Sequence, residues 1–222
     1  MKRTVSLATA MTLLAACAAP PAGTPAPAPA VPVGARPAGS AVTTDTTGSA
    51  LVPAGLGTLR QDDIAIKLQL PDVLVKMIPL DESVIRTLSP DSYRALRDLV
   101  ESRRGAITRL ASQHGFLRGD VWYVSFFGLA PEARFSPLEL TVTSAGRDFR
   151  PAEAIPLTSG FGSQRLQPRE TQSALYLFDD ALDVNQPLTV SFAGQQNVAW
   201  TAILRTIERE RAVIRSRAQA RQ

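Results

Sequence analysis

Few residues in this chain combine reactive side chains with a recognisable spacing. His114 is the only histidine and Cys17 the only cysteine among the 222 residues. A Ser-His-Asp triad would have to use His114, but no Gly-x-Ser-x-Gly sequence supplies the serine. His114 instead precedes Gly115 at the end of an expected helix, where an imidazole interacts with the helix dipole. Single copies of both residues exclude clustered zinc ligands and intrachain disulfides. We therefore expect no metal centre, no cofactor and no enzymatic activity.

A second group of candidate residues carries oxygen ligands. Asp179, Asp180, Asp183 and Asn185 lie within seven positions of one another. Calcium binds several such oxygens in one loop, but this spacing does not match an EF-hand and lacks its central glycine. A solvated turn is favoured, and a calcium site at Asp179, Asp183 and Asn185 is the alternative. Carboxylates that meet only in the fold could also serve a hydrolase.

The N-terminus has the features of a signal peptide. Lys2 and Arg3 precede an apolar run of about a dozen residues, too short to cross roughly 30 Å of hydrocarbon. The run ends in Leu14-Ala15-Ala16-Cys17, which resembles the lipobox of bacterial lipoproteins. The resemblance implies that residues 1–16 are removed and that Cys17 carries a diacylglycerol and an additional acyl chain such as palmitate. Ala18 stands where an aspartate would retain the protein at the inner membrane, which implies the periplasmic face of the outer membrane.

Residues 17–57 form the next region. They are rich in alanine and proline, with alternating prolines at positions 25, 27 and 29. Proline fixes its own φ angle and restricts the preceding residue, so this composition favours polyproline II over helix or sheet. We expect a disordered spacer between the lipid anchor and a folded domain.

Residues 58–204 have the pattern of a β domain. Alternation predicts strands at 64–70 and 73–78, joined by a hairpin or a kink at Pro71. The apolar run 121–127 predicts the central strand of the core, and further strands are expected near 138–142, 174–178, 188–192 and 197–203. About seven short strands indicate an antiparallel β-sandwich. The layout resembles the immunoglobulin-like (Ig-like) domains of bacterial envelope proteins, without the disulfide cysteines. The expected fold class is mainly β with helical additions: an antiparallel Ig-like β-sandwich with a helical insertion and a C-terminal helix.

Two helical regions accompany these strands. In the insertion at 81–114, Asp81 is expected to cap a short helix. Ser89-Pro90-Asp91 then begins a longer helix that ends at Gly115, with Gly105 as a potential break. The second region, 205–222, is expected to be a basic helix.

The basic tail accounts for the charge of the whole chain. The formal net charge is +4, and Lys2 and Arg3 leave with the signal peptide. Arg209, Arg211 and Arg215 belong to the tail, which either packs on the domain, binds an anionic surface or contacts a protein partner. The extended segment 146–170 is expected to be a loop, with Phe161 at its centre, and long loops often carry function. We therefore expect Phe161, Arg209, Arg211 and Arg215 to form binding surfaces.

These observations favour a lipid-anchored cell-envelope protein that acts as a binding or scaffolding module on the periplasmic side. Its expected partners are the membrane, through the lipid on Cys17, and an envelope protein or anionic envelope polymer. Nucleic acid is not expected, because the protein is exported. Two alternatives remain: a carboxylate-dependent envelope hydrolase and a purely structural tether.

Overall fold

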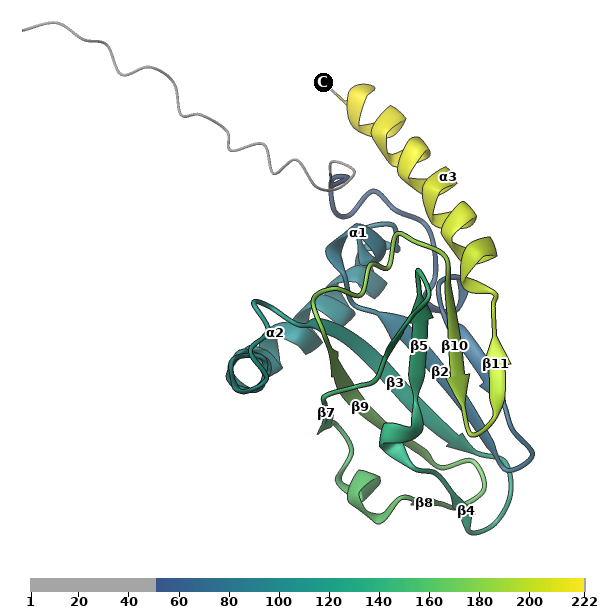
Figure 1. Ribbon diagram of the computed structural model, residues 1–222. Helices are drawn as coiled ribbons and strands as arrows, with labels where there is room; N and C mark the ends of the chain where they lie inside the picture. The colour runs from purple at the N-terminus through teal and green to yellow at the C-terminus, as the bar shows by residue number, and fades with distance from the viewer. Residues whose placement is uncertain (1–50, 222) are drawn as a thin grey trace, which may run out of the picture. The chain divides into compact units, whose positions relative to one another are not determined.

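The computed structural model describes residues 51–221. The predicted signal peptide, Cys17 and most of the predicted spacer lie outside them. The described chain folds into two antiparallel sheets, a short two-stranded ladder and three α-helices (Figure 1). The larger sheet has the order β1 (Ile66–Gln69), β2 (Val73–Pro79), β3 (Asp120–Gly128), β9 (Thr171–Phe178) and β7 (Glu153–Pro156). The smaller has the order β11 (Gln195–Asn197), β10 (Leu188–Phe192), β5 (Thr141–Ser144) and β6 (Arg147–Phe149), and β4 (Ala133–Arg134) pairs with β8 (Arg165–Leu166).

Strand β3 occupies the centre of the larger sheet, as its doubly apolar sequence predicted. It pairs with β2 on one side and with β9 on the other. The side chains of Trp122, Val124 and Phe126 alternate along it and are fully buried. This face of β3 packs against the smaller sheet, because the Phe126 ring lies 5.6 Å from that of Phe192 in β10.

The two sheets also meet along one edge, where Asn197 Nδ2 donates a hydrogen bond of 2.7 Å to the Lys67 carbonyl. The predicted hairpin of β1 and β2 is present, with Leu70 N donating to Val73 O across the turn. The mainly β, antiparallel sandwich with a helical insertion and a C-terminal helix is therefore confirmed.

The helical insertion comprises α1 (Glu82–Ile85) and α2 (Pro90–Gln113). The predicted cap is confirmed, because the Asp81 carboxylate accepts a hydrogen bond from Ser83 N at 2.8 Å. The expected break at Gly105 is wrong, since α2 runs through it. A glycine at an exposed helix position costs only about 1 kcal/mol, which the rest of the helix outweighs. Gly115, at φ +75°, ends the helix as predicted.

Three segments differ from the sequence prediction. The expected loop at 146–170 contains β6, β7, β8 and the 3₁₀-helix η3 (Ser159–Ser163). Of the expected strand at 197–203, only Asn197 lies in a strand, as the last residue of β11. Helix α3 (Trp200–Gln219) begins at Trp200, which is fully buried and whose Nε1 donates to the Val184 carbonyl at 2.9 Å. Residues Pro137–Glu139 form a 3₁₀ turn, η2, before β5. A third 3₁₀ turn, η1 (Gln61–Asp63), precedes β1.

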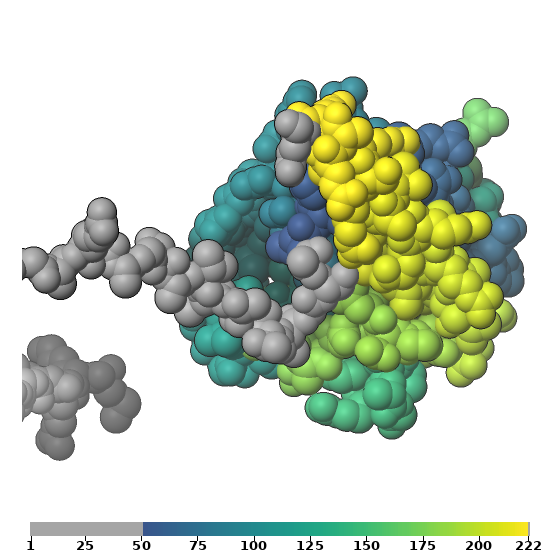
Figure 2. All heavy atoms as spheres, turned by 90° about the horizontal axis from the view of Figure 1, so that it is seen from above, coloured from purple at the N-terminus to yellow at the C-terminus, as the bar shows by residue number. Residues whose placement is uncertain are grey.

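The described chain begins against the end of the domain that carries α1 and α3. Val52 is buried, and its carbonyl accepts a hydrogen bond from Arg86. Gly57 lies so close to Thr87 that an added Cβ would stand 2.2 Å from its carbonyl oxygen. Residues 51–57, which we expected to belong to the spacer, thus pack on the domain. Helix α3 covers much of this end (Figure 2), whereas β4 and β8 lie at the opposite end (Figure 1).

None of the helices within residues 51–221 has the length and apolar character needed to span a membrane.

Candidate functional site

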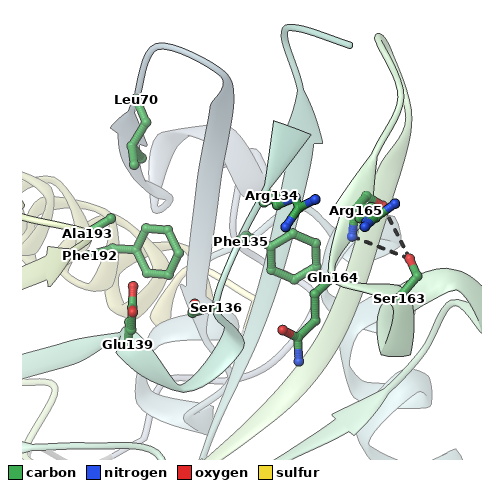
Figure 3. A pocket seen from close by; sticks show the side chains of 10 residues that line it. All are labelled: Leu70, Arg134, Phe135, Ser136, Glu139, Ser163, Gln164, Arg165, Phe192 and Ala193. Atoms are coloured by element: carbon green, nitrogen blue, oxygen red, sulfur yellow. Dashed lines mark hydrogen bonds between the residues drawn. The ribbon is translucent and has the colours of Figure 1, made fainter. Parts of the chain in front are cut away.

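A cleft opens at the end of the domain that lies away from α1 and α3. It has a volume of about 470 Å³, which falls within the usual range for ligand pockets. The tips of the β1–β2 and β10–β11 hairpins contribute to it, together with the segments around β4 and β8. Figure 3 shows the lining residues, which are Leu70, Arg134, Phe135, Ser136, Glu139, Ser163, Gln164, Arg165, Phe192 and Ala193.

Aromatic rings give the cleft a rigid apolar wall. Phe135 and Phe192 line it, and both pack against Phe126, at ring-centroid distances of 4.2 and 5.6 Å. Both lining rings are more than nine-tenths buried, so the cleft meets only their edges. Because these side chains belong to the common core, the wall of the cleft is fixed by the packing of the two sheets.

Phe161, which we expected to form a binding surface, lies in the core. Only 4% of it is exposed, and its ring lies 5.6 Å from that of Phe135. The prediction for Phe161 is therefore wrong. Burial of this aromatic side chain removes apolar surface from water, which stabilises the fold. Its neighbours Ser163, Gln164 and Arg165, in the same predicted loop, do line the cleft.

The polar groups of the cleft make few bonds within the protein. Arg165 Nη1 lies 3.7 Å from Glu132 Oε2. Within the described chain, the side chains of Arg134, Ser136, Glu139 and Gln164 form no hydrogen bond or ion pair. The cleft thus offers a guanidinium, a hydroxyl, an amide and a carboxylate to solvent.

Backbone strain also gathers around the cleft. Glu132, Gln164 and Ala193 have φ angles of +54°, +53° and +46°, in the left-handed region that favours glycine. Such conformations cost a non-glycine residue about 1–3 kcal/mol and are common near functional sites. Gln164 and Ala193 line the cleft, and Glu132 contacts Arg165 beside it.

A second cavity, of about 360 Å³, lies at the other end of β3 and is acidic. Three of its aspartates hold loops in place. Asp180 accepts hydrogen bonds from the backbone N–H groups of Leu117, Arg118 and Gly119. Burial raises the pKa of Asp180, but these three donors outweigh it and hold the pKa below its usual value. Asp81 caps α1, and Asp183 Oδ1 accepts from Asn185 N at 2.8 Å.

Asp120 is the exception in this cavity. Its Oδ2 atom is buried and has no hydrogen-bond partner within the described residues. Burial, together with the nearby carboxylates of Asp81, Asp180 and Asp183, raises the pKa of Asp120 to about 8. Asp120 is therefore protonated at neutral pH. The neighbouring carboxylates of Asp81, Asp180 and Asp183 all accept backbone hydrogen bonds, so none of them forms a free pair with Asp120.

In the turn that we considered for calcium, side-chain oxygens accept hydrogen bonds from within the protein. Asp179 Oδ1 accepts from Ala181 N, and Asn185 Oδ1 accepts from Arg211 Nη2 at 2.9 Å. A guanidinium thus occupies an oxygen that a calcium ion would need. Between residues 51 and 221, no group of three or more His, Cys, Asp or Glu side chains is placed to hold a metal ion.

The three tail arginines have different environments. Arg211 has only 3% of its side chain exposed, and its Nε and Nη2 atoms donate to the Ser83 carbonyl at 3.1 and 2.8 Å. It fixes α3 to α1, so the prediction of a binding role for Arg211 is wrong. The sequence held a signal for this, because Arg211 shares the inner helix face with Ile207 and Ile214.

Arg209 and Arg215 are exposed on α3. Arg209 Nη2 donates to Thr206 Oγ1 at 3.1 Å. Both residues lie at the end of the domain opposite the cleft, so the structure does not bring them together with the segment around Phe161 (Figure 1). A binding role for these two arginines stays a prediction.

Comparison with known proteins identifies no relative: no family model, no curated protein and no solved structure matches this chain. The candidate function therefore depends on the geometry of the cleft and on the sequence before it.

Proposed function

We propose that this protein is a lipid-anchored binding module of the bacterial cell envelope, held at the periplasmic face of the outer membrane through Cys17. The support for the anchor is the leader sequence, in which Leu14-Ala15-Ala16-Cys17 follows a basic and then an apolar segment. Two or three acyl chains on one cysteine make membrane attachment effectively permanent. The prediction of a spacer after Cys17 fits a domain that must reach a ligand beyond the lipid surface.

The observation that carries the binding function is the cleft with its unbonded polar groups. Ligand pockets combine an apolar wall with a few polar groups that fix the orientation of the ligand. Here the edges of Phe135 and Phe192 supply the wall, and the side chains around them supply donors and acceptors. The cleft opens at the end of the domain opposite the one that carries α1 and α3 (Figure 1).

The hydrolase alternative finds less support. Retaining and inverting mechanisms at two carboxylates both require a pair of groups free to act on a substrate. In the acidic cavity, Asp120 is the one carboxyl with an unbonded buried oxygen, and the carboxylates of Asp81, Asp180 and Asp183 accept bonds from the backbone. A purely structural tether would have no use for an open cleft with strained walls.

The anchor is tested by replacing Cys17 with serine and fractionating cells. We expect the wild-type protein in the outer-membrane fraction, and the C17S protein as an unprocessed precursor or as a soluble periplasmic form. An A18D variant serves as the matched control, because it keeps the cysteine and is expected to move the lipidated protein to the inner membrane. Membrane-bound, fully processed C17S protein would contradict the proposal.

Ligand binding is tested in intact cells with a photo-crosslinking amino acid at Ser136, which is exposed and lines the cleft. The matched control carries the same group at Arg103, an exposed position on α2. We expect an envelope component to crosslink from position 136 and not from position 103. Equal labelling from both positions, or none from position 136, would contradict a ligand-binding cleft.

A further inference from the structure

The two arginines of the cleft face each other across the β4–β8 ladder. The register places Arg134 directly opposite Arg165. Side chains of directly opposed residues in an antiparallel pair project from the same face, with their Cβ atoms about 4.5–5.5 Å apart. Like charges in this position destabilise the pair. Arg134 and Arg165 therefore project from the same face of the ladder, and both line the cleft.

The surrounding carboxylates neutralise only one side of this pair. Glu132 contacts Arg165 at 3.7 Å and also accepts a hydrogen bond of 2.6 Å from Gln167 Nε2. Glu139 lines the cleft but forms no ion pair with either arginine. Among the described residues, the guanidinium of Arg134 has no counter-ion. Its planar array of donors matches the oxygens of a carboxylate or a phosphate.

The local backbone is arranged around the same two residues. Gln164, in the left-handed region, directly precedes Arg165, and Glu132, also left-handed, stands two residues before Arg134. The Gln164 carbonyl accepts a hydrogen bond from Phe135 N at 3.2 Å, which ties the turn before β8 to the residue after Arg134. Two residues with left-handed backbone thus flank the ladder that carries the two arginines.

The remaining groups of the cleft suit a ligand rich in hydroxyl groups. Ser136 and the amide of Gln164 can donate and accept, and Glu139 accepts. The small exposed parts of Phe135 and Phe192 form an apolar boundary between these polar groups. Figure 3 shows these polar groups distributed around the two rings, with the arginines on neighbouring strands.

We infer that the cleft binds an acidic saccharide, whose carboxylate or phosphate is bound by Arg134 and Arg165 while Ser136, Gln164 and Glu139 bind its hydroxyl groups. The inference rests on the proposed binding function and specifies the chemical class of the ligand. An anionic group explains why two arginines are kept adjacent without full neutralisation.

The test is an NMR titration of the mature chain in detergent with four probes: trigalacturonate, maltotriose, glucose 6-phosphate and inorganic phosphate. The first two have three sugar rings each and differ in their carboxylates. We expect trigalacturonate to bind at least tenfold more tightly than maltotriose, and to shift the amide signals of Arg134, Gln164 and Arg165. An R134Q variant should lose at least tenfold in affinity for the acidic probe, whereas R103Q, on exposed α2, should bind normally.

Several outcomes separate the sources of the anion. Preference for trigalacturonate assigns a carboxylate, and preference for glucose 6-phosphate assigns a phosphate; both support the inference. Binding that inorganic phosphate alone reproduces would overturn the saccharide assignment. Equal affinity for maltotriose and trigalacturonate, unaffected by R134Q, would overturn the anionic class.

Failure of the inference is distinguishable from failure of the proposed function. If no saccharide binds but position 136 still crosslinks to an envelope protein in cells, the ligand class is wrong and the binding module stands. If neither experiment detects a ligand, both are wrong. Far-ultraviolet circular dichroism of R134Q checks that the loss does not come from unfolding.

Discussion

The two ends of strand β3 use charged side chains in opposite ways. Asp120 begins the strand beside the acidic cavity, and Gly128 ends it near the cleft, a separation of roughly 27 Å for an extended strand. At the first end, Asp180 and Arg211 are bonded to backbone atoms of other segments. At the second end, Arg134 and Gln164 have no side-chain partner in the described chain, and the backbone carries strain instead.

The difference shows that residue type alone does not distinguish structural from binding positions. A buried charge must have partners, since an uncompensated charge in the interior is costly. A charge that keeps its hydrogen-bonding capacity unused at the surface of a cleft remains available for a ligand. The comparison predicts large changes of stability from substitutions at the first end, with a sign that depends on whether the charge has partners, and small changes at the second.

The largest effect is expected for Arg211→Ala. The substitution removes every hydrogen bond that the guanidinium makes to the Ser83 carbonyl and to Asn185 Oδ1, and Asn185 Oδ1 then keeps only the Ser83 hydroxyl as a donor. A hydrogen bond with a charged group typically contributes about 1.5–3 kcal/mol, so we expect the loss of several of them to lower the free energy of unfolding by at least that amount. Urea denaturation, followed by tryptophan fluorescence, measures the loss because Trp200 lies on the same helix.

Arg209→Ala is the matched control on the same helix. Its guanidinium is exposed and donates only to Thr206. Exposed contacts of this kind contribute little, so we expect a change of no more than about 0.5 kcal/mol. Equal losses for the two variants would show that helix propensity, rather than the buried contact, determines the effect.

The acidic cavity makes a pH-dependent prediction at Asp120. Its pKa is raised to about 8, so between about pH 4 and pH 8 the folded protein keeps a proton that the unfolded chain has lost. This group therefore lowers the free energy of unfolding as pH rises through that window, by up to about 1.4 kcal/mol per pH unit. We expect Asp120→Asn to match the wild type near pH 4 and to be more stable by a few kcal/mol near pH 8. Denaturation midpoints measured across this range test the prediction.

Asp180→Asn provides the control of opposite sign in the same cavity. Because the pKa of Asp180 is lowered in the folded protein, its charge stabilises the fold above the unfolded pKa. The variant should be less stable than the wild type at pH 7, and the difference should vanish as pH falls through the folded-state pKa. Parallel pH profiles for the two variants would contradict the distinct roles of these aspartates.

Much of the fold was predictable because local rules and tertiary packing agree in those segments. The doubly apolar run from Val121 to Phe127 could only be a central strand, and Asp81 and Pro90 sit at helix starts where their chemistry is favourable. The errors arise where packing overrides the local pattern. Val198 and Ala199 extend the alternation of a strand, yet the burial of Trp200 places that segment at the start of α3.

The candidate site was predictable only in part. The sequence indicated a functional role for the segment 146–170, and its residues Ser163, Gln164 and Arg165 do line the cleft. Its central aromatic residue, Phe161, belongs to the core instead. Arg134 and Arg165 stand 31 positions apart in unremarkable sequence. Their adjacency depends on a two-residue ladder, which has no periodicity long enough to detect.

At the cleft end of β3, a small effect on stability is expected for Gln164→Gly. Glycine adopts the φ of +53° without steric cost but loses more conformational entropy on folding. The two terms nearly cancel, so we expect a gain in stability of no more than about 1 kcal/mol. The same variant should bind trigalacturonate several-fold more weakly, because the side-chain amide is gone.

Arg169→Gly separates strain from binding in that experiment. Arg169 has a φ of +67° but does not line the cleft, so its replacement relieves comparable strain without removing a ligand contact. We expect the two glycine variants to have similar denaturation midpoints and only Gln164→Gly to lose affinity. A marked loss of stability in Gln164→Gly alone would show that its side chain supports the fold. In that case the polar side chains of the cleft, like those of the acidic cavity, would stabilise the fold, and they would not be available to bind a ligand.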